Sequence, residues 1–304
     1  MNILITGGTG MVGTDLIQSL SIDNDNVYVL TRQKDKKNYD NVTFVTYNPT
    51  QPDDLSFCDH LPQEIDAIYN LAGASLQRRW TDDYKKRILS SRVNVTKMLV
   101  EAIATNRFKV GVLVNASAIG YYPPSTSIHF VESHAFVPQD FLSSVVTEWE
   151  NTALQARAYG VRVVFARFGL ILDKNRGALK LMSLPYKFKV GGKIGQGNQW
   201  YSWIHIEDVV NGLLFVFANS DIEGPVNFTA PEPLRQKDFS TYLSSTLEQP
   251  EFFTTPEFVI RFALGEMSTL VLDSQFVLPE VLIENEFKFL YPSLDVALDR
   301  IYKD

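Results

Sequence analysis

The sequence of 304 residues contains only one cysteine, Cys58, and only four histidines. A lone cysteine excludes an intramolecular disulfide, a cysteine-rich zinc site and a CxxC redox pair, and it is typical of a reducing compartment. The histidines form no HExxH or HxxxH pair, the kind of spacing that places two metal ligands on one helix face. We therefore expect no metal site in this protein.

Positive charge and long hydrophobic runs are also scarce. Lys and Arg number 28 against 35 Asp and Glu, so the net charge is −7. Because nucleic acids and anionic membranes attract clustered positive charge, we expect no nucleic-acid partner and no membrane partner. The longest apolar run, over residues 212–218, is far shorter than the roughly 20 residues that span a bilayer. The N-terminus lacks the segments of a targeting signal, so we expect a cytoplasmic protein.

What is present predicts a layered α/β fold. Short runs rich in β-branched residues alternate with longer amphipathic runs, a pattern typical of βαβ units and a parallel sheet. Asp140 is positioned to cap the third helix, and Gly160 to end it. We expect strands near residues 2–6, 27–31, 42–46, 67–71, 110–116 and 161–168, and helices near residues 11–20, 84–105 and 141–159.

The second half of the chain has a different character. After residue 170 the alternation weakens, and glycine and proline recur. We expect residues 1–170 to form a doubly wound parallel sheet with its helices, and residues 171–304 a smaller C-terminal substrate lobe with a terminal helix from Ser293. The boundary is soft, because a strand or helix of the second half can return to the main sheet. The oligomeric state is left open.

A glycine-rich turn directly follows the first expected strand and opens a helix. Gly7, Gly10 and Gly13 satisfy GxxGxxG, and Gly8 with the last two satisfies GxGxxG. Glycine suits such a turn because the backbone must approach a pyrophosphate closely, and the helix that follows directs its N–H groups and positive dipole end at that anion. The turn predicts a Rossmann-type dinucleotide site, with contacts at Gly7, Thr9, Gly10, Met11, Val12 and Gly13.

The end of the second strand distinguishes two coenzymes. An NAD site places a carboxylate about 20 residues beyond the glycines, but this chain has Thr31 and Arg32 there. A guanidinium binds the 2′-phosphate of NADP, whereas a carboxylate repels it. NADP is therefore favoured over NAD, and a solvated basic loop over residues 32–37 is the alternative. Leu71, Ala72 and Gly73 end the fourth strand and are expected to pack against a ribose of the cofactor.

With these residues, the chain resembles an atypical or extended short-chain dehydrogenase/reductase of the NAD(P)-dependent epimerase/dehydratase superfamily. More narrowly, it is similar to the SDR39U1 group of epimerase family proteins. Beyond the glycine turn the resemblance is carried by Asn70-Leu71-Ala72-Gly73, Arg79-Trp80-Thr81, Ser91-Arg92 with Thr96, Ala118-Ile119-Gly120-Tyr121-Tyr122, Trp149-Glu150, Arg167-Phe168-Gly169, Gly177-Ala178-Leu179, Gly191-Gly192, Ser202-Trp203-Ile204-His205 with Asp208, Leu264-Gly265-Glu266 and Tyr291-Pro292.

The resemblance implies an NADP-binding Rossmann domain with contacts at the glycine turn and at Thr31, Arg32, Leu71 and Ala72. Arg92 falls where ordinary extended members carry an Asn. This departure suggests a charged contact with cofactor or substrate, and its alternative is a helix-surface arginine paired with a carboxylate.

The catalytic Tyr-x-x-x-Lys pair usual in this superfamily is missing, because none of the 13 tyrosines has Lys four residues on. If Trp149-Glu150 sets the register, the two catalytic positions fall near Leu142 and Val146, both apolar. The remaining candidates, each with a structural alternative as a turn former, packed ring or satisfied histidine, are Ser117, Tyr121, Tyr122 and His205.

Three functional hypotheses follow. The favoured one is an NADP-dependent oxidoreductase or epimerase with an unusual acid/base and an unidentified small-molecule substrate. The second is a non-catalytic NADP-binding regulatory protein, which the loss of the Tyr-Lys pair favours. The third is an assembly protein whose partner binds the aromatic C-terminal lobe, although helical core packing explains its aromatic residues more simply: Phe252, Phe253, Phe258 and Phe262.

Overall fold

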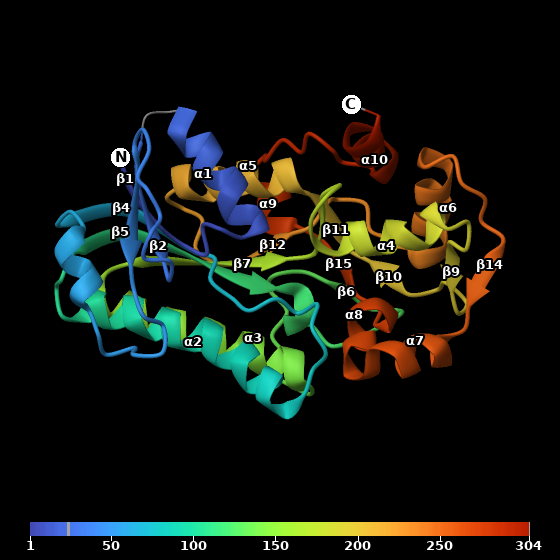
Figure 1. Cartoon of the computed structure of the whole chain (residues 1–304), viewed down its shortest axis with the longest axis horizontal. Coiled ribbons are helices and arrows are strands. Elements are labelled where there is room, and N and C mark those ends of the chain that lie inside the picture. Colours follow the sequence, from blue (N-terminus) through green and yellow to red (C-terminus); the bar gives the residue numbers. More distant parts are fainter. Residues whose placement is uncertain (23–24, 304) are drawn as a thin grey trace.

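The computed structural model describes residues 1–22 and 25–303 and is built on a seven-stranded parallel sheet (Figure 1). The strand order is β12-β7-β5-β4-β1-β2-β3, so the chain winds outward from β1 in both directions. This doubly wound arrangement confirms the predicted fold class. In sheets of this kind ligands bind in a crevice outside the carboxyl ends of the strands where the strand order reverses, here beside β1. The bounds are β1 Asn2–Thr6, β2 Asn26–Thr31, β3 Val42–Thr46, β4 Glu64–Asn70, β5 Lys109–Ala118, β7 Arg162–Phe168 and β12 Gly224–Phe228.

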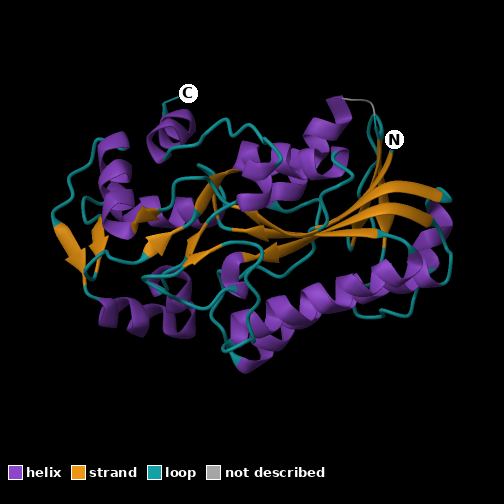
Figure 2. Ribbon diagram, turned by 180° about the vertical axis from the view of Figure 1, so that it is seen from behind, coloured by secondary structure: helices purple, strands orange, loops and turns teal. Residues whose placement is uncertain are grey.

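Helices cover both faces of the sheet (Figure 2). On one face α1 (Met11–Ile22) and α5 (Ile206–Ala218) pack on a core that contains Ile3 and Ile5. On the other face α2 (Asp82–Ala104) packs on a core that contains Leu4, with α3 (Phe141–Leu154) beside it. Successive residues of a strand point to opposite faces, so an uninterrupted apolar strand such as β1 fits a sheet that is buried on both sides.

The ends of α3 follow from its sequence. Asp140 caps the helix, because its carboxylate accepts a hydrogen bond from the Ser143 amide while the Ser143 hydroxyl accepts one from the Asp140 amide. The helical run continues as a 3₁₀ turn over Gln155–Tyr159 and ends at Gly160, whose φ of 78° is left-handed. Both predicted ends are confirmed, and the capping box satisfies two backbone N–H groups at the start of α3.

The second half contributes both to the sheet and to a lobe beyond its carboxyl edge. β12 pairs in parallel with β7, so a strand of the second half is part of the main sheet. The lobe has its own core, which includes Trp203, Phe239 and Leu298. Its elements, with β6 from the first half, are β6 His129–Phe130, β8 Leu170–Leu172, α4 Gly177–Lys187, β9 Gly192–Ile194, β10 Trp200–Tyr201, β11 Trp203–His205, β13 Leu234–Arg235, α6 Gln236–Thr246, β14 Phe253–Thr255, α7 Glu257–Leu264, α8 Thr269–Leu272, β15 Phe276–Val277, α9 Glu280–Glu284 and α10 Leu294–Tyr302.

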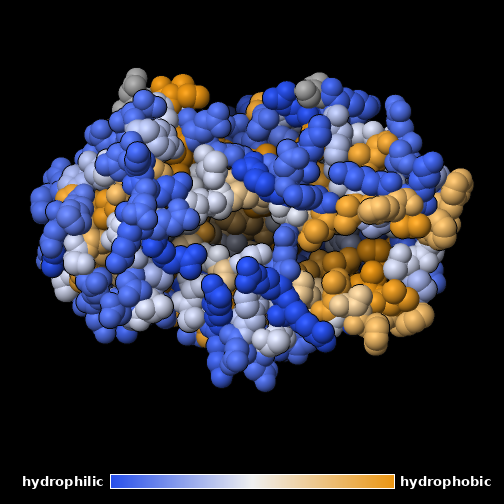
Figure 3. Space-filling model, in the orientation of Figure 1, coloured by the Kyte–Doolittle hydropathy of each residue, from blue (hydrophilic) through white to orange (hydrophobic). Residues whose placement is uncertain are grey.

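The four phenylalanines expected to pack in this lobe lie outside its core. Phe252, Phe253, Phe258 and Phe262 are 81%, 51%, 72% and 92% exposed, and α7 buries none of its residues. The expectation of helical core packing is therefore wrong. Apolar spacing predicts that a helix face is suited to burial, but not that another element covers it. Figure 3 shows the apolar surface of this region at the lower right.

Within the described residues, no helix combines the length and the hydropathy needed to cross a bilayer.

Candidate functional site

The glycine-rich turn lies at the carboxyl end of β1, and its glycines meet different surroundings. Gly7 has a φ of 70°, and a Cβ there would lie 2.5 Å from the Leu71 carbonyl oxygen. A Cβ on Gly13 would lie 2.5 Å from the Gly7 carbonyl oxygen, so this glycine lets α1 pack on the turn. Gly10 is exposed, and a Cβ there would meet only the Gly7 oxygen, at 3.2 Å. A Cβ on Gly8 would lie 2.5 Å from Val29 Cγ1. Packing thus requires three of the four glycines, while Gly10 leaves backbone open to a ligand.

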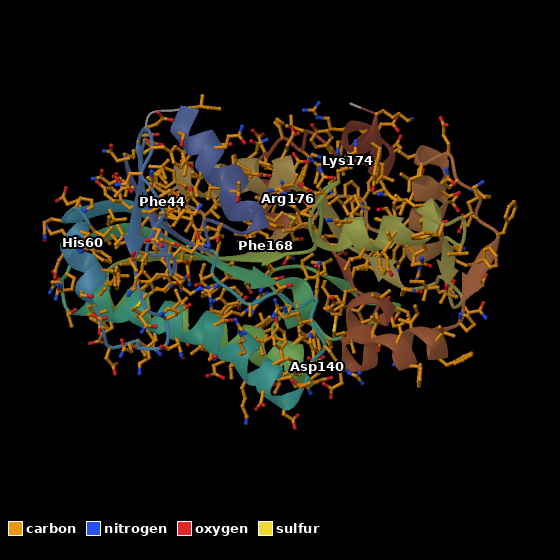
Figure 4. The ribbon with its side chains drawn as sticks, in the orientation of Figure 1. Phe44, His60, Asp140, Phe168, Lys174 and Arg176 are labelled. Atoms are coloured by element: carbon orange, nitrogen blue, oxygen red, sulfur yellow. The ribbon has the colours of Figure 1, made fainter. Side chains whose placement is uncertain are left out.

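One wall of the turn comes from the segment before α4. The Arg176 guanidinium donates to both carboxylate oxygens of Asp15, at 2.8 and 2.7 Å, and to the Met11 carbonyl oxygen at 3.1 Å. A Cβ on Gly177 would lie 3.1 Å from the Met11 sulfur. Figure 4 places Arg176 beside α1. This contact, which the sequence did not predict, holds the C-terminal lobe against the start of α1, where Met11 and Val12 are half-buried and Thr9 is exposed.

The end of β2 leaves a positive charge in solvent. Thr31 is buried, and its hydroxyl accepts a hydrogen bond from the Gln33 amide. Arg32 is exposed and forms no ion pair with any residue that the structure describes. Its guanidinium therefore needs no rearrangement of protein partners to receive an anion.

Buried polar side chains connect β1, β4 and α2 beneath the crevice. The Thr6 hydroxyl donates to the Asn70 side-chain oxygen at 2.6 Å and accepts from the Ala72 amide at 3.1 Å. The Asn70 side chain donates to the Thr96 hydroxyl at 2.7 Å, and the Trp149 indole donates to the same hydroxyl at 2.9 Å. These bonds fix the backbone at Ala72 and Gly73, since satisfied buried networks are rigid. A polar residue at the end of each apolar strand is the sequence signal that could have revealed this hydrogen-bond network.

Arg92 lies against the exposed Gly73 at the end of β4. Its guanidinium carbon would be 3.0 Å from a Cβ on Gly73, and it lies 5.2 Å from the centroid of the Trp149 ring. Its Nη1 donates to the carbonyl oxygens of Ile88 and Ala74, at 2.9 and 3.3 Å. Burial lowers the pKa of Arg92 to about 10. No described carboxylate pairs with it, so the alternative of a surface ion pair is wrong.

Ser117 is joined to a buried ion pair at the ends of β5 and β7. The Ser117 hydroxyl donates to Glu150 Oε1 at 2.6 Å. Arg167 binds the same carboxylate with two parallel hydrogen bonds of 2.8 Å, from Nε to Oε1 and from Nη2 to Oε2. All three side chains are buried. Sequence reasoning noted Glu150 and Arg167 as motif residues but did not foresee that they pair.

Tyr121 and Tyr122 both contact Arg167, but they differ in burial and in hydrogen bonding. Tyr122 is fully buried; its hydroxyl accepts from Arg167 Nη1 at 3.0 Å and donates to the Asn227 side-chain oxygen at 2.9 Å. Burial raises the pKa of Tyr122 to about 12, so the phenol stays neutral. Tyr121 is half-buried, its ring centroid lies 3.5 Å from the Arg167 guanidinium carbon, and its hydroxyl oxygen accepts from the Phe136 amide at 3.2 Å.

His205 lies at the end of β11, outside the main sheet. It caps α5, because its Nδ1 accepts a hydrogen bond from the Glu207 amide at 3.2 Å. Its ring centroid is 4.0 Å from that of Tyr291, and burial lowers the pKa of His205 to about 4. In the part of the chain that the structure describes, no hydrogen bond or ring contact joins His205 to Ser117, Tyr121 or Tyr122.

The described residues contain no cluster of three or more His, Cys, Asp or Glu side chains that could hold a metal ion.

Comparison with known proteins identifies the family. The model of the NAD dependent epimerase/dehydratase family matches residues 3–228. The chain belongs to this family. A second model, described as a domain of unknown function (DUF1731), matches residues 255–301. Among similar proteins, epimerase family protein SERP0438 of Staphylococcus epidermidis is 43% identical over 300 residues, which cover 99% of this chain and 98% of that protein. Epimerase family protein SA0724 of Staphylococcus aureus is 42% identical over 302 residues, with 99% of both chains covered.

Solved structures agree with the family. Human epimerase family protein SDR39U1 with NADPH matches with a TM-score of 0.87 and 29% identity over the full length of both chains. The nucleoside-diphosphate sugar epimerase from Corynebacterium glutamicum matches with a TM-score of 0.79 and 28% identity, covering 99% of this chain and 58% of that one. The resemblance drawn from the sequence is thereby confirmed.

Within this epimerase family protein, the start of α3 has no tyrosine or lysine at the expected register. Leu142 lies under the Ile119–Tyr121 turn, where its Cβ would be 3.6 Å from a Cβ on Gly120. Val146, one helical turn further on, is buried. The place of the missing pair is therefore packed with apolar side chains, and Tyr121 lies on the turn that covers it.

Proposed function

We propose that this protein is an NADP(H)-dependent oxidoreductase or epimerase that acts on a small molecule through an atypical active site. The observation that carries the proposal is the glycine turn, where Gly7 and Gly13 are needed for packing but Gly10 is exposed and leaves the backbone accessible. A glycine that packing barely requires is explained by a ligand that approaches the chain closely, as a pyrophosphate does.

The preference for NADP rests on Arg32. This side chain follows β2, is exposed and has no ion-pair partner among the described residues. A planar guanidinium suits the 2′-phosphate, and no carboxylate occupies residue 31 or 32 to bind the 2′-hydroxyl of NAD. The similarity to a human protein whose structure contains NADPH supports the same choice.

Tyr121 is the group best placed to move a proton. When bound, the nicotinamide supplies or accepts hydride. The hydroxyls of Ser117 and Tyr122 already donate to Glu150 and Asn227, whereas the Tyr121 O–H has no acceptor among the described residues. The Tyr121 ring lies against the Arg167 guanidinium and its oxygen accepts from the Phe136 amide, so the position of the Oη atom is fixed. Tyr121 Oη would donate that proton to a carbonyl oxygen of the substrate.

A non-catalytic NADP-binding regulatory protein is the second candidate. It is favoured by one observation, the apolar packing of Leu142 and Val146 where the catalytic pair would lie. Either function is compatible with a cytoplasmic location. The one cysteine, Cys58, is a buried free thiol, which is typical of proteins in a reducing compartment.

Coenzyme fluorescence separates the two candidates. We expect the protein to bind NADPH and to oxidise it with a member of a panel of aldehydes, ketones and sugar nucleotides. Tyr121→Phe should then lower kcat by about a hundredfold or more without weakening NADPH binding, and Tyr122→Phe serves as the matched control for loss of a neighbouring hydroxyl. Tight binding with no turnover of any compound supports the regulatory protein, and absence of NADPH binding contradicts both.

Arg32→Asp tests the coenzyme preference. We expect it to weaken the binding of NADPH by about tenfold or more relative to the binding of NADH. A carboxylate repels the 2′-phosphate of NADPH but can accept a hydrogen bond from the 2′-hydroxyl of NADH. Fluorescence titration with both coenzymes measures the ratio. An equal loss for both would show that Arg32 does not meet the 2′-phosphate.

A further inference from the structure

Arg92 is a cation without a counter-ion at the crevice. Its guanidinium packs between Gly73 and the Trp149 ring, and its described hydrogen bonds are to the carbonyl oxygens of Ala74 and Ile88. Two other arginines of this edge are neutralised, Arg167 by Glu150 and Arg176 by Asp15 and Asp173, whereas Arg32 is unpaired but exposed to solvent. Arg92, unlike Arg167 and Arg176, keeps its full charge unopposed.

An unopposed charge at such a place is unfavourable for folding alone. Arg92 is half-buried, and guanidinium groups partly withdrawn from water are normally paired, because neutral carbonyl oxygens compensate only part of the lost solvation. An apolar side chain of the same length would fill the space beside Trp149 at lower cost. A function that uses the charge explains why an arginine is present.

The position of Arg92 indicates which anion it meets. Along the edge of the sheet, Arg32 follows β2, the glycine turn follows β1, and Gly73 follows β4. Arg92, on α2, lies against Gly73. In the proposed function the first two receive the 2′-phosphate and the diphosphate of the coenzyme. Arg92 lies on the opposite side of β1 from Arg32, toward β5 and Tyr121, where the coenzyme has no further phosphate group.

We propose that Arg92 binds an oxyanion of the substrate, a carboxylate or phosphate, so that the substrates are anionic carbonyl or hydroxyl compounds. The planar fork of the guanidinium accepts two oxygens of such a group in parallel. This inference rests on the proposed function, because it assigns the coenzyme phosphates to the other two places. The coenzyme diphosphate is the competing source of the same chemistry.

Stability of the free protein gives the first test, and it needs no coenzyme. We expect Arg92→Met to leave the midpoint of urea unfolding unchanged or raised, because it removes an uncompensated charge and keeps the packing against Trp149. The matched control is Arg162→Met. Arg162 also contacts only carbonyl oxygens, those that end α5, but it is far from the crevice at the amino end of β7, and its loss should lower the midpoint. A lowered midpoint for Arg92→Met, equal to that of the control, would mean that Arg92 is structural.

Binding of inorganic phosphate and oxalate gives the second test. At matched ionic strength, both anions should raise the melting temperature of the wild type and of Arg162→Met, with and without NADPH. The effect should disappear in Arg92→Met and persist in part in Arg92→Lys, which keeps a point charge without the fork. The same anion effect in wild type and Arg92→Met would overturn the proposal.

NADPH titration of the same variants shows whether Arg92 binds an anion of the substrate or the diphosphate of the coenzyme. If the substrate supplies the anion, Arg92→Met binds NADPH within about threefold of wild type, less than one hydrogen bond to a charged group contributes. A loss of about tenfold or more would assign Arg92 to the coenzyme diphosphate and overturn the substrate proposal. If the wild type binds no NADPH at all, the proposed function fails, while the phosphate and oxalate response still decides whether Arg92 is an anion site.

Discussion

At the scale of single residues, the carboxyl edge of the sheet is organised by charges that water does not reach. Glu150 and Arg167 are held by two parallel hydrogen bonds, and Ser117 and Tyr122 add their hydroxyls to the same pair. Buried pairs of this kind contribute little when intact but cost much when one partner is removed, because the remaining charge has no solvent. The pair therefore fixes the Tyr121 turn more than it stabilises the molecule.

Removing one partner tests this directly. We expect Glu150→Ala to lower the free energy of unfolding by about 3–5 kcal/mol, because Arg167 is left charged and buried. The control is Asp59→Ala, which breaks the exposed pair with Arg107 and should cost at most about 1 kcal/mol. Urea unfolding measures both. Equal small losses would mean that Arg167 finds water or another partner.

His205 gives a pH dependence whose sign follows from its burial. Its pKa in the folded protein is about 4, below the unfolded value of about 6.5, so the unfolded chain takes up a proton first. Between these two values stability falls as pH falls, and the contribution of the neutral ring is fully present only above about 6.5. In His205→Asn the side chain still caps α5 but does not titrate. We expect the stability difference between wild type and variant to shrink from pH 7 to pH 4, measured by urea unfolding; a constant difference would contradict the burial.

At the scale of elements, the unit of β1, turn and α1 is constrained by the end of β4. Gly7 adopts a left-handed φ and faces the Leu71 carbonyl oxygen at a distance that leaves no room for a side chain. The turn therefore cannot tolerate a side chain here without moving the segment that follows β4 and carries Leu71 and Gly73.

We expect Gly7→Ala to abolish NADPH binding and to lower the free energy of unfolding by more than about 2 kcal/mol, because the clash adds to the cost of the left-handed backbone. Gly160→Ala is the matched control. Gly160 has a φ of 78° but open space around its Cβ, so its replacement should cost about 1–2 kcal/mol and leave coenzyme binding intact. Coenzyme titration and urea unfolding check both variants. Intact binding in Gly7→Ala would contradict the role of the turn.

Local sequence patterns predicted the elements far better than the contacts between them. β1 and β3 were placed at their observed bounds, since each is a short apolar run with a clear break after it. β12 was not placed, because its Gly-Pro start is untypical of a strand and its pairing with β7 is a tertiary contact. The glycine turn was likewise visible, whereas the pairing of Glu150 with Arg167 depends on how α3 packs on β7, which no local pattern encodes.

At the scale of the whole molecule, two surfaces of the C-terminal lobe contrast. One side has a core of its own and holds the start of α1 through Arg176. The other side carries the aromatic residues of β14 and α7 in solvent. Apolar composition is thus a poor guide to which part of this lobe is structural.

A pair of phenylalanines tests this contrast. Phe262→Ala should change the free energy of unfolding by at most about 0.5 kcal/mol, because the side chain is 92% exposed. Phe239→Ala, in the core of the same lobe, should cost about 3–5 kcal/mol. Urea unfolding of both variants gives the comparison. A large loss for Phe262→Ala would mean that α7 packs against something in solution.

The position of β12 has a consequence for the order of synthesis. A nascent chain that has emerged only as far as β7 presents that strand with one row of backbone groups unpaired, the kind of edge that recruits foreign strands. The row is covered only after α5 and residue 228 have left the ribosome. A fragment that carries every proposed coenzyme contact is therefore still an incomplete sheet, and truncation after β7 would create a molecule prone to aggregation rather than a smaller binding protein.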